Sequence, residues 1–297
     1  MGDDNKNDLL IIGAGLGRTG TKSLSNALTV LGYKTYHMED KIENRNEDRD
    51  VWNRWARTEV DTADPDEKKA AIREILDLFK RAGVNATTDF PACVLYREFM
   101  EVYPNAKVIL SARRSGEKWA TSFDRTIGRV APAIERAGRP WRWIPAVDRF
   151  IRDDLTFNAA FFKRVAGMEA YASGAYTAPF PLQSFTKEQM EIFAKAHDDW
   201  KAEVIRHVPT EKLLIYHPGD GYRPLCTFLG IENCPTGNPP KGWNTSQTFS
   251  KIISALEILT FFGPWLILML YAYFTLNCCC ARKRKGSQKD GGRSKND

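Results

Sequence analysis

Five strand-like runs alternate with longer segments of helical periodicity between residues 8 and 231 of the chain. The runs are "DLLIIG" (8–13), "YKTYHM" (33–38), "VNATTDF" (84–90), "AKVILSAR" (106–113) and "EKLLIYHP" (211–218). Helices are predicted at 21–32, 66–82, 91–104, 115–123, within 130–180, at 186–207 and at 221–231. Short apolar runs separated by helices are typical of parallel strands that are buried on both faces. The pattern therefore predicts an α/β domain with a central parallel sheet in three layers.

A second pattern begins at residue 258, where "ILTFFGPWLILMLYAYFTLNCCC" continues to residue 280 without a charged side chain. A helix of this length and composition is long enough to cross a bilayer. The tail that follows carries seven Lys/Arg and two Asp, which accounts for +5 of the formal net charge of +6. The rest of the chain is close to neutral and gives no reason to expect a nucleic-acid partner. We divide the chain into a domain (1–250), a hydrophobic membrane segment (251–280) and a basic tail (281–297).

The N-terminus "MGDDNKND" is acidic and polar, so it is not a secretory signal. We therefore expect the domain in the cytosol and the C-terminal segment in a membrane, with membrane lipid as a partner. A single tail-anchored span is favoured. The alternative is a hairpin that turns at Gly263-Pro264 and keeps the basic tail in the cytosol, as the positive-inside rule prefers. Palmitoylation of Cys278 to Cys280 would reinforce the anchor.

The six cysteines predict neither a metal site nor a disulfide framework. Cys93, Cys226 and Cys234 are isolated in the sequence, and the other three are contiguous. The chain has no CxxC pair of the kind that binds zinc. We therefore expect a site without a metal.

The stretch "LLIIGAGLGRTGTKSL" (9–24) places four glycines within eight residues, between the first strand and the first helix. Such a loop cradles a phosphate group. Gly15, Gly17 and Gly20 fit the dinucleotide fingerprint G-x-G-x-x-G, but the loop is more polar than that fingerprint needs. The Walker A spacing is also present, but Thr21 stands where its lysine belongs. Neither template accounts for the whole loop.

The part of this loop from Gly17 to Ser23, G-R-T-G-T-K-S, resembles the P-K-S-G-T-T-W loop of the P-loop sulfotransferase superfamily. With "YHM" and "D-x-P" further on, the chain is most similar to the branch that begins G-x-G-R-T-G-T-x-S, over about residues 8–250. The resemblance implies a P-loop fold and 3′-phosphoadenosine 5′-phosphosulfate (PAPS) as co-substrate. It also implies that the loop binds PAPS through Gly17, Arg18, Thr19, Gly20, Thr21, Lys22 and Ser23. Arg18, at the place of the family's basic residue, would stabilise charge on the leaving 5′-phosphate oxygen.

Two further stretches carry the same resemblance. "KVILSARRSGEKWATSF" (107–123) resembles the signature in which a strand-end arginine and a helix serine bind the 3′-phosphate, which implies Arg113 and Ser122. The spacing from Arg113 to Ser122 is one residue longer than in the signature, and Arg114 would restore the usual spacing. "TTDFP" (87–91) resembles the stretch that holds the catalytic base, which implies Asp89, and His37 is the alternative base. The acceptor is an unidentified molecule that bears a hydroxyl or an amine, and the oligomeric state is open.

Other interpretations compete with this one. The first alternative is an NAD-dependent epimerase or reductase, and the second is a nucleotide hydrolase or kinase. The third is a non-catalytic membrane adaptor that has kept the fold. Asp89 has a structural alternative as the N-cap of a helix that begins at Pro91. His197 and His207 belong to a helical stripe that is expected to face the core. An acceptor pocket or a packed aromatic cluster is predicted for Arg139, Trp141, Arg142 and Trp143.

Overall fold

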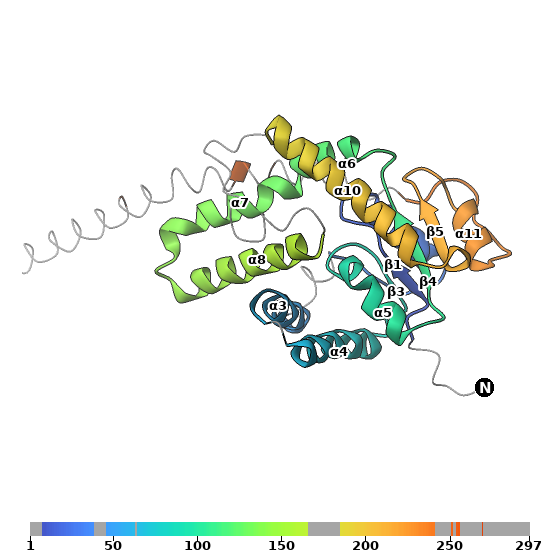
Figure 1. Cartoon of the computed structure of the whole chain (residues 1–297), viewed down its shortest axis with the longest axis horizontal. Helices are drawn as coiled ribbons and strands as arrows, with labels where there is room; N and C mark the ends of the chain where they lie inside the picture. Colours follow the sequence, from blue (N-terminus) through green and yellow to red (C-terminus); the bar gives the residue numbers. More distant parts are fainter. Residues whose placement is uncertain are drawn as a thin grey trace, which may run out of the picture.

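The computed structural model describes residues 8–38, 46–62, 64–165 and 185–240, together with residues 251, 254, 255 and 269. This part of the chain contains a five-stranded parallel sheet with the order β2-β3-β1-β4-β5 (Figure 1). The strands are β1 (Ile11–Gly13), β2 (Thr35–Tyr36), β3 (Ala86–Thr87), β4 (Lys107–Ser111) and β5 (Leu213–Tyr216). The predicted α/β fold with a central parallel sheet is therefore confirmed.

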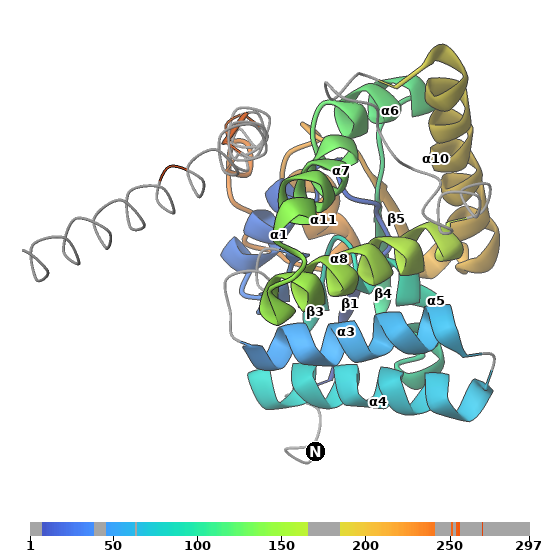
Figure 2. The ribbon, with the colours of Figure 1, turned by 90° about the vertical axis from the view of Figure 1, so that its left-hand side faces the viewer.

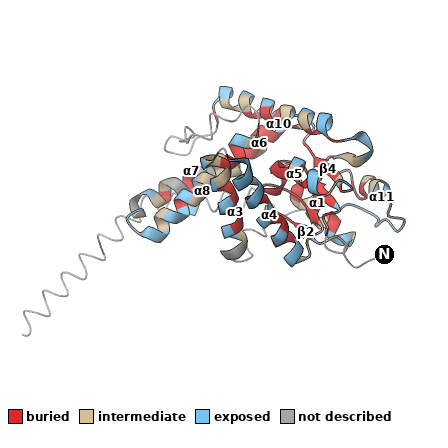
Figure 3. Ribbon diagram, turned by 60° about the horizontal axis from the view of Figure 1, so that its bottom comes forward, coloured by how far each residue is buried: buried red, intermediate tan, exposed pale blue. Residues whose placement is uncertain are grey.

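Helices cover both faces of the sheet because successive strand side chains point in opposite directions. Ile11 belongs to a small core shared with α1 (Thr21–Val30) and α11 (Arg223–Leu229). Its neighbour Ile12 belongs to the large core of the other face. Figure 3 shows the buried positions, in red, concentrated on the strands and on the inner sides of the surrounding helices. Burial on both faces explains why the strands are continuous apolar runs.

The remaining helices, with the exception of α3, fall close to the predicted segments. They are α3 (Asn46–Asp61), α4 (Pro65–Ala82), α5 (Tyr96–Val102), α6 (Gly116–Asp124), α7 (Ile127–Gly138), α8 (Pro145–Arg164) and α10 (Lys187–His207), with short 3₁₀ turns η2 (Ala92–Leu95), η3 (Arg139–Trp141) and η4 (Thr210–Lys212). α4 shows why the boundaries follow the sequence. The Asp64 side chain accepts a hydrogen bond from the Asp66 N–H, and Gly83 takes a left-handed conformation at the other end.

The helices α7 and α8 run back along each other, with η3 between them. Figure 1 shows their turn at the side of the domain that lies away from the sheet, and Figure 2 shows the two helices from that side. α8 also packs on α3, which in turn packs on α4. The hairpin of α7 and α8 therefore joins the sheet region to an outer helical layer.

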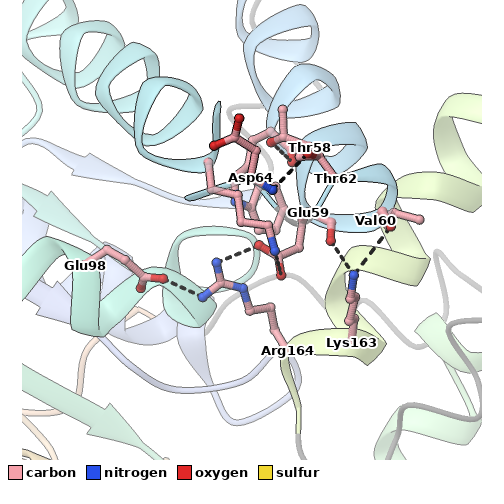
Figure 4. Close-up of polar contacts among 10 residues, drawn as sticks. Thr58, Glu59, Val60, Thr62, Asp64, Glu98, Lys163 and Arg164 are labelled. Carbon is pink, nitrogen blue, oxygen red and sulfur yellow. Dashed lines mark hydrogen bonds and ion pairs between the residues drawn. The ribbon is translucent and has the colours of Figure 1, made fainter. Parts of the chain in front are cut away.

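A buried charge cluster holds this outer layer to the sheet region (Figure 4). Arg164, at the end of α8, donates to Glu59 of α3 at 2.6 Å and to Glu98 of α5 at 2.5 Å. Burial alone would lower the pKa of Arg164, but the charges of Glu98 and Glu59 outweigh it and raise that pKa. The neighbouring Lys163 ammonium donates to the carbonyl oxygens of Glu59 and Val60 near the end of α3, at 2.7 and 3.4 Å. The cluster thus fixes α8 against two other helices.

Three local features differ from the prediction. α3 was not predicted at all, and the segment after Pro91 forms η2 before α5 begins. Cys226 and Cys234 form a disulfide bond, although no disulfide was expected from the spacing of the cysteines. Gly230 ends α11 in a left-handed conformation, and the chain then turns back so that the two cysteines meet. Cys93 is free and buried.

The described residues include no helix that is both long and apolar enough to cross a bilayer. The predicted membrane segment at 258–280 lies outside the described residues except for Met269, and so does the whole basic tail. Gly263-Pro264 and Cys278 to Cys280 lie outside them as well.

Candidate active site

The sheet brings four of the predicted side chains to one edge. Arg18 follows β1, His37 follows β2, Asp89 follows β3 and Arg113 follows β4. β1 lies between β3 and β4, and the connections that leave β1 and β3 run in opposite directions across the sheet. Ligands of open α/β sheets bind beyond the carboxyl ends of the strands at such a switch point. The fold therefore defines a candidate site at this edge.

Glycines allow the loop between β1 and α1 to approach the neighbouring strands closely. A β-carbon at Gly13 would overlap the carbonyl oxygen of Thr87, and one at Gly15 would overlap the side chain of Ser111. Gly20, the last loop residue, has a φ of +92° that favours glycine. The glycine spacing seen in the sequence thus reflects the packing of the loop against β3 and β4.

Side chains from two distant helices bind the backbone carbonyls of this loop. The Trp119 indole of α6 donates to the carbonyl of Gly17 at 2.8 Å, and the Trp200 indole of α10 donates to that of Ala14 at 2.9 Å. The Thr19 hydroxyl donates to a third loop carbonyl at 2.6 Å. These hydrogen bonds hold the backbone of the loop in place. The two tryptophans were missed from the sequence, where nothing distinguishes them from core residues.

Arg18 lies at the centre of the loop in an unusual backbone conformation. Its φ of +70° lies in the left-handed region, which is uncommon for a side chain other than glycine. Burial lowers the pKa of Arg18, the charge of Asp89 acts against this effect, and the charge of Arg113 adds to it. Two guanidinium groups and one carboxylate are therefore close enough to influence one another.

The helix α1 begins directly after the loop, at Thr21, and continues through Lys22 and Ser23. The first N–H groups of an α-helix have no partner within the helix, and the helix dipole favours an anion at that end. Thr21 is buried, whereas Lys22 and Ser23 are partly exposed. Backbone N–H groups and hydroxyl-bearing residues thus lie at one helix end, with Lys22 in the same helical turn, which suits a phosphate or sulfate group.

Arg113 connects the loop to α6. Its Nε donates to the carbonyl oxygen of Arg18 at 2.9 Å, and its Nη2 lies 3.5 Å from the Oγ of Ser122. Burial lowers the pKa of Arg113. Arg114 is exposed. Of the two arginines that the sequence left open, Arg113 is the one that contacts Ser122.

Asp89 and His37 face each other across the ends of β3 and β2. Asp89 Oδ2 lies 3.1 Å from His37 Nε2, and the Thr21 hydroxyl lies 3.3 Å from the same nitrogen. Both side chains are largely buried. Within the described ranges, no group of three or more His, Cys, Asp and Glu side chains is arranged to hold a metal ion. The structure therefore presents a carboxylate that contacts an imidazole, and the imidazole in turn contacts Thr21 at the start of α1.

The side chain of Asp89 does not serve as the helix cap that the sequence offered as an alternative. Its backbone carbonyl accepts from the N–H of Cys93 at 2.9 Å, while its carboxylate is directed at His37. Asp89 has a φ of +71°, and a cis peptide bond follows between Phe90 and Pro91. Burial, and then the charge of Asp89, raises the pKa of the Cys93 thiol well above its usual value. Cys93 therefore stays protonated and is a poor nucleophile.

The other candidates lie outside this group. His197 is buried, its ring centroid is 5.4 Å from that of Trp119, and burial lowers its pKa. The expected core-facing position is confirmed for His197 and is wrong for His207, which is exposed. Trp143 is 74% exposed in the turn between α7 and α8, and it belongs to neither buried hydrophobic cluster of the described residues.

Comparison with known proteins agrees with the geometry of the loop. Residues 10–248 match the protein family described as "Sulfotransferase domain". The chain belongs to this family. It is also 31% identical over 215 residues to a protein of Aspergillus versicolor named "Ava biosynthesis cluster protein M", which covers 72% of this chain and 74% of that protein. The sulfotransferase domain thus begins just before β1, extends beyond α11 and includes the four strand-end side chains described above.

Proposed function

We propose that the chain transfers a sulfuryl group from PAPS to a hydroxyl or amine acceptor. The proposal rests chiefly on Arg113, which contacts both the carbonyl of Arg18 in the loop and the hydroxyl of Ser122. A nucleotide with anionic groups at both its 5′ and 3′ positions needs two anion sites. An arginine fork beside a hydroxyl is suited to a phosphate. Enzymes that act on nucleoside triphosphates have no need of this second site.

The donor set of the loop fits the 5′-phosphosulfate end of PAPS. Thr21, Lys22 and Ser23 form the first turn of α1, and Arg18 precedes it in the loop. Gly17 keeps the surface between loop and base open, because a β-carbon there would lie 3.1 Å from Asp89 Oδ1. In this proposal the residues from Gly17 to Ser23 bind the 5′-phosphosulfate, and Arg113 with Ser122 binds the 3′-phosphate.

Arg18 is proposed to stabilise the negative charge that grows on the leaving 5′-phosphate oxygen. An arginine remains charged in proteins, so it acts through its charge and its hydrogen bonds rather than by giving up a proton. Donors that are already in place before the reaction stabilise such charge most effectively. The restricted backbone of Arg18 and the Arg113 contact to its carbonyl are consistent with this role.

Asp89 and His37 are proposed to receive the proton of the acceptor. The acceptor oxygen or nitrogen forms a bond to sulfur, and the sulfur–oxygen bond to the 5′-phosphate breaks. The acceptor's proton passes to the Asp89–His37 pair, whose facing atoms are 3.1 Å apart. A proton taken by one group can then be shared with the other. The pair therefore acts as a single base, with the Thr21 hydroxyl beside it.

The membrane segment remains part of the proposal. The uncharged run at 258–280 and the basic tail support attachment to a membrane with the domain in the cytosol. The single tail-anchored span and the hairpin differ in where they leave the C-terminus. In sealed microsomes, a protease-protected C-terminal tag supports the span, and an accessible tag supports the hairpin. A protected domain would contradict the cytosolic assignment.

The donor is tested by thermal shift of the full chain in detergent. Adenosine 3′,5′-bisphosphate should stabilise the protein more than AMP, NAD or magnesium-ATP does. Ser122→Ala and Arg113→Ala should weaken binding of the bisphosphate by about 10- to 100-fold, the worth of a hydrogen bond to a charged group. AMP binding should change less in Ser122→Ala, which leaves the Arg113–Arg18 contact intact.

Arg114→Ala is the matched control, because it removes the same side chain one position further on, where it is exposed. It should bind adenosine 3′,5′-bisphosphate as the wild type does. Equal stabilisation by AMP and the bisphosphate, or equal losses in Arg113→Ala and Arg114→Ala, would contradict the assignment of the 3′-phosphate site.

A further inference from the structure

The connection between α7 and α8, together with the first two turns of α8, exposes both aromatic and cationic side chains. Trp143 is 74% exposed and Phe150 is 48% exposed. Four exposed arginines accompany them: Arg139, Arg142, Arg149 and Arg152. Large aromatic side chains are costly to leave in water, and isolated ones need no explanation. Here the two lie seven residues apart, and four arginines lie in the same stretch, residues 139–152. We call residues 139–152 the hairpin tip.

The hairpin tip carries a positive formal net charge. Asp148 is the single carboxylate between residues 139 and 152, so the net charge of the tip is +3. Asp148 contacts both Arg142 and Arg152, each at 2.7 Å, and therefore compensates only part of their charge. The tip also lies at the side of the domain away from the sheet (Figure 1), where it takes no part in the loop or base described above.

We propose that the hairpin tip docks onto the surface of an anionic lipid bilayer. Tryptophan is favoured at the boundary between head groups and acyl chains, and arginines near the surface are attracted to anionic lipids. The same pairing of aromatic and basic side chains characterises segments that lie in the membrane interface. The apolar run at 258–280 and the +5 tail are a second lipid-directed part of the same chain.

A second copy of the chain fits this surface less well. Self-association through the tip would bring two groups of charge +3 together, which is unfavourable unless other charges intervene. A bilayer that contains anionic lipid offers the complementary charge and also an apolar region for Trp143 and Phe150. Charge complementarity therefore favours the lipid surface.

The test uses the full chain on vesicles, with and without phosphatidylserine in phosphatidylcholine, and acyl-chain-brominated lipid as quencher. The protein has eight tryptophans, so the Trp143 signal is taken as the difference in quenching between the wild type and Trp143→Phe. We expect this difference to be large on vesicles with phosphatidylserine and small on phosphatidylcholine alone. Because Trp143 is largely exposed, its replacement leaves the core unchanged.

Charge reversal separates docking of the tip from anchoring by the C-terminal segment. Arg149→Glu removes one attractive charge and adds a repulsive one, which should lower the docked-to-undocked ratio by about 30-fold. Arg73→Glu makes the same change on an exposed position of α4 and should leave the Trp143 signal unchanged. For the Arg149→Glu variant, the Trp143 signal is the difference in quenching between that variant and the double variant Trp143→Phe/Arg149→Glu.

Three results would overturn the proposal. The first is an absent Trp143 signal on vesicles with phosphatidylserine. The second is a signal that is equal on both vesicle types or equally sensitive to Arg149→Glu and Arg73→Glu. The third is protection of Trp143 from aqueous iodide that rises with protein concentration in the absence of vesicles, which would assign the tip to contact between copies of the chain.

Discussion

Replacing Arg164 by methionine should destabilise the domain by about 3 kcal/mol, because it leaves two carboxylates without their shared partner. The side chain of Glu59 is only 7% exposed and that of Glu98 is 24% exposed, and both contact Arg164 (Figure 4). Breaking a buried ion pair on one side costs about 3–5 kcal/mol. The lower end applies here because the Lys68 ammonium remains 3.7 Å from Glu59 and Glu98 is partly solvated.

The matched control is Arg54→Met on α3. Arg54 contacts Glu74 at 2.8 Å, but the two side chains are 50% and 48% exposed. An exposed pair of this kind contributes about 0–1 kcal/mol. The double variant Glu59→Gln/Arg164→Met should recover part of the stability lost in Arg164→Met, because a neutral amide then replaces the more deeply buried of the two stranded carboxylates.

Urea unfolding of the full chain in detergent, followed by tryptophan fluorescence, measures these differences in the free energy of unfolding. The comparison requires the same dependence of that free energy on urea concentration in every variant. The loss of unfolding free energy in Arg164→Met, relative to the wild type, should be largest near neutral pH. It should shrink as the pH falls, since protonation removes the stranded charge in the folded variant. If Arg164→Met and Arg54→Met lose the same free energy, the cluster is effectively solvated and the reasoning from burial is refuted.

Three further predictions concern the site and its surroundings. Asp89→Asn should slow release of adenosine 3′,5′-bisphosphate from PAPS by about 10²- to 10⁴-fold, with bisphosphate affinity unchanged in thermal shift. Gly17→Ala, whose β-carbon would lie 3.1 Å from Asp89 Oδ1, should lower the same rate more than it weakens nucleotide binding. Burial lowers the pKa of His197 from its usual 6.5, so the wild type should lose stability as the pH falls below that value, because the unfolded chain takes up the proton first. His197→Gln should flatten this dependence in urea unfolding between about pH 7.5 and 5.5.

The sheet could be predicted because strands that are buried on both faces appear in the sequence as continuous apolar runs. α3 was missed because its first turns are charged and only a narrow stripe is apolar. That stripe includes Trp52 and Trp55, which are fully or almost fully buried. The disulfide was missed because no local pattern joins Cys226 to Cys234. They meet only through the left-handed turn at Gly230.

The contact between Asp89 and His37 follows from the register of two strands. β2 and β3 are adjacent and parallel, with Tyr36 opposite Thr87. His37 follows Tyr36 by one residue and Asp89 follows Thr87 by two, so both leave the sheet at the same edge. The sequence placed each at a strand end, but it gave no information on which strands are neighbours. It therefore offered two separate candidates for the base where the structure has one pair.

The helical hairpin gives a reason to connect this pair with the bilayer. At its start, Ile127 Cδ1 would lie 3.4 Å from a β-carbon on Gly17. Within α8, the Phe157 ring is 4.6 Å from that of Phe90, the residue after Asp89. If the hairpin tip docks on lipid, the same element sets the orientation of the loop and the base relative to the bilayer. Phosphatidylserine in the vesicles should then raise the rate of transfer to acceptors embedded in the bilayer and leave the affinity for adenosine 3′,5′-bisphosphate unchanged. An equal gain for a water-soluble acceptor would show that the lipid acts on the site itself rather than on its orientation.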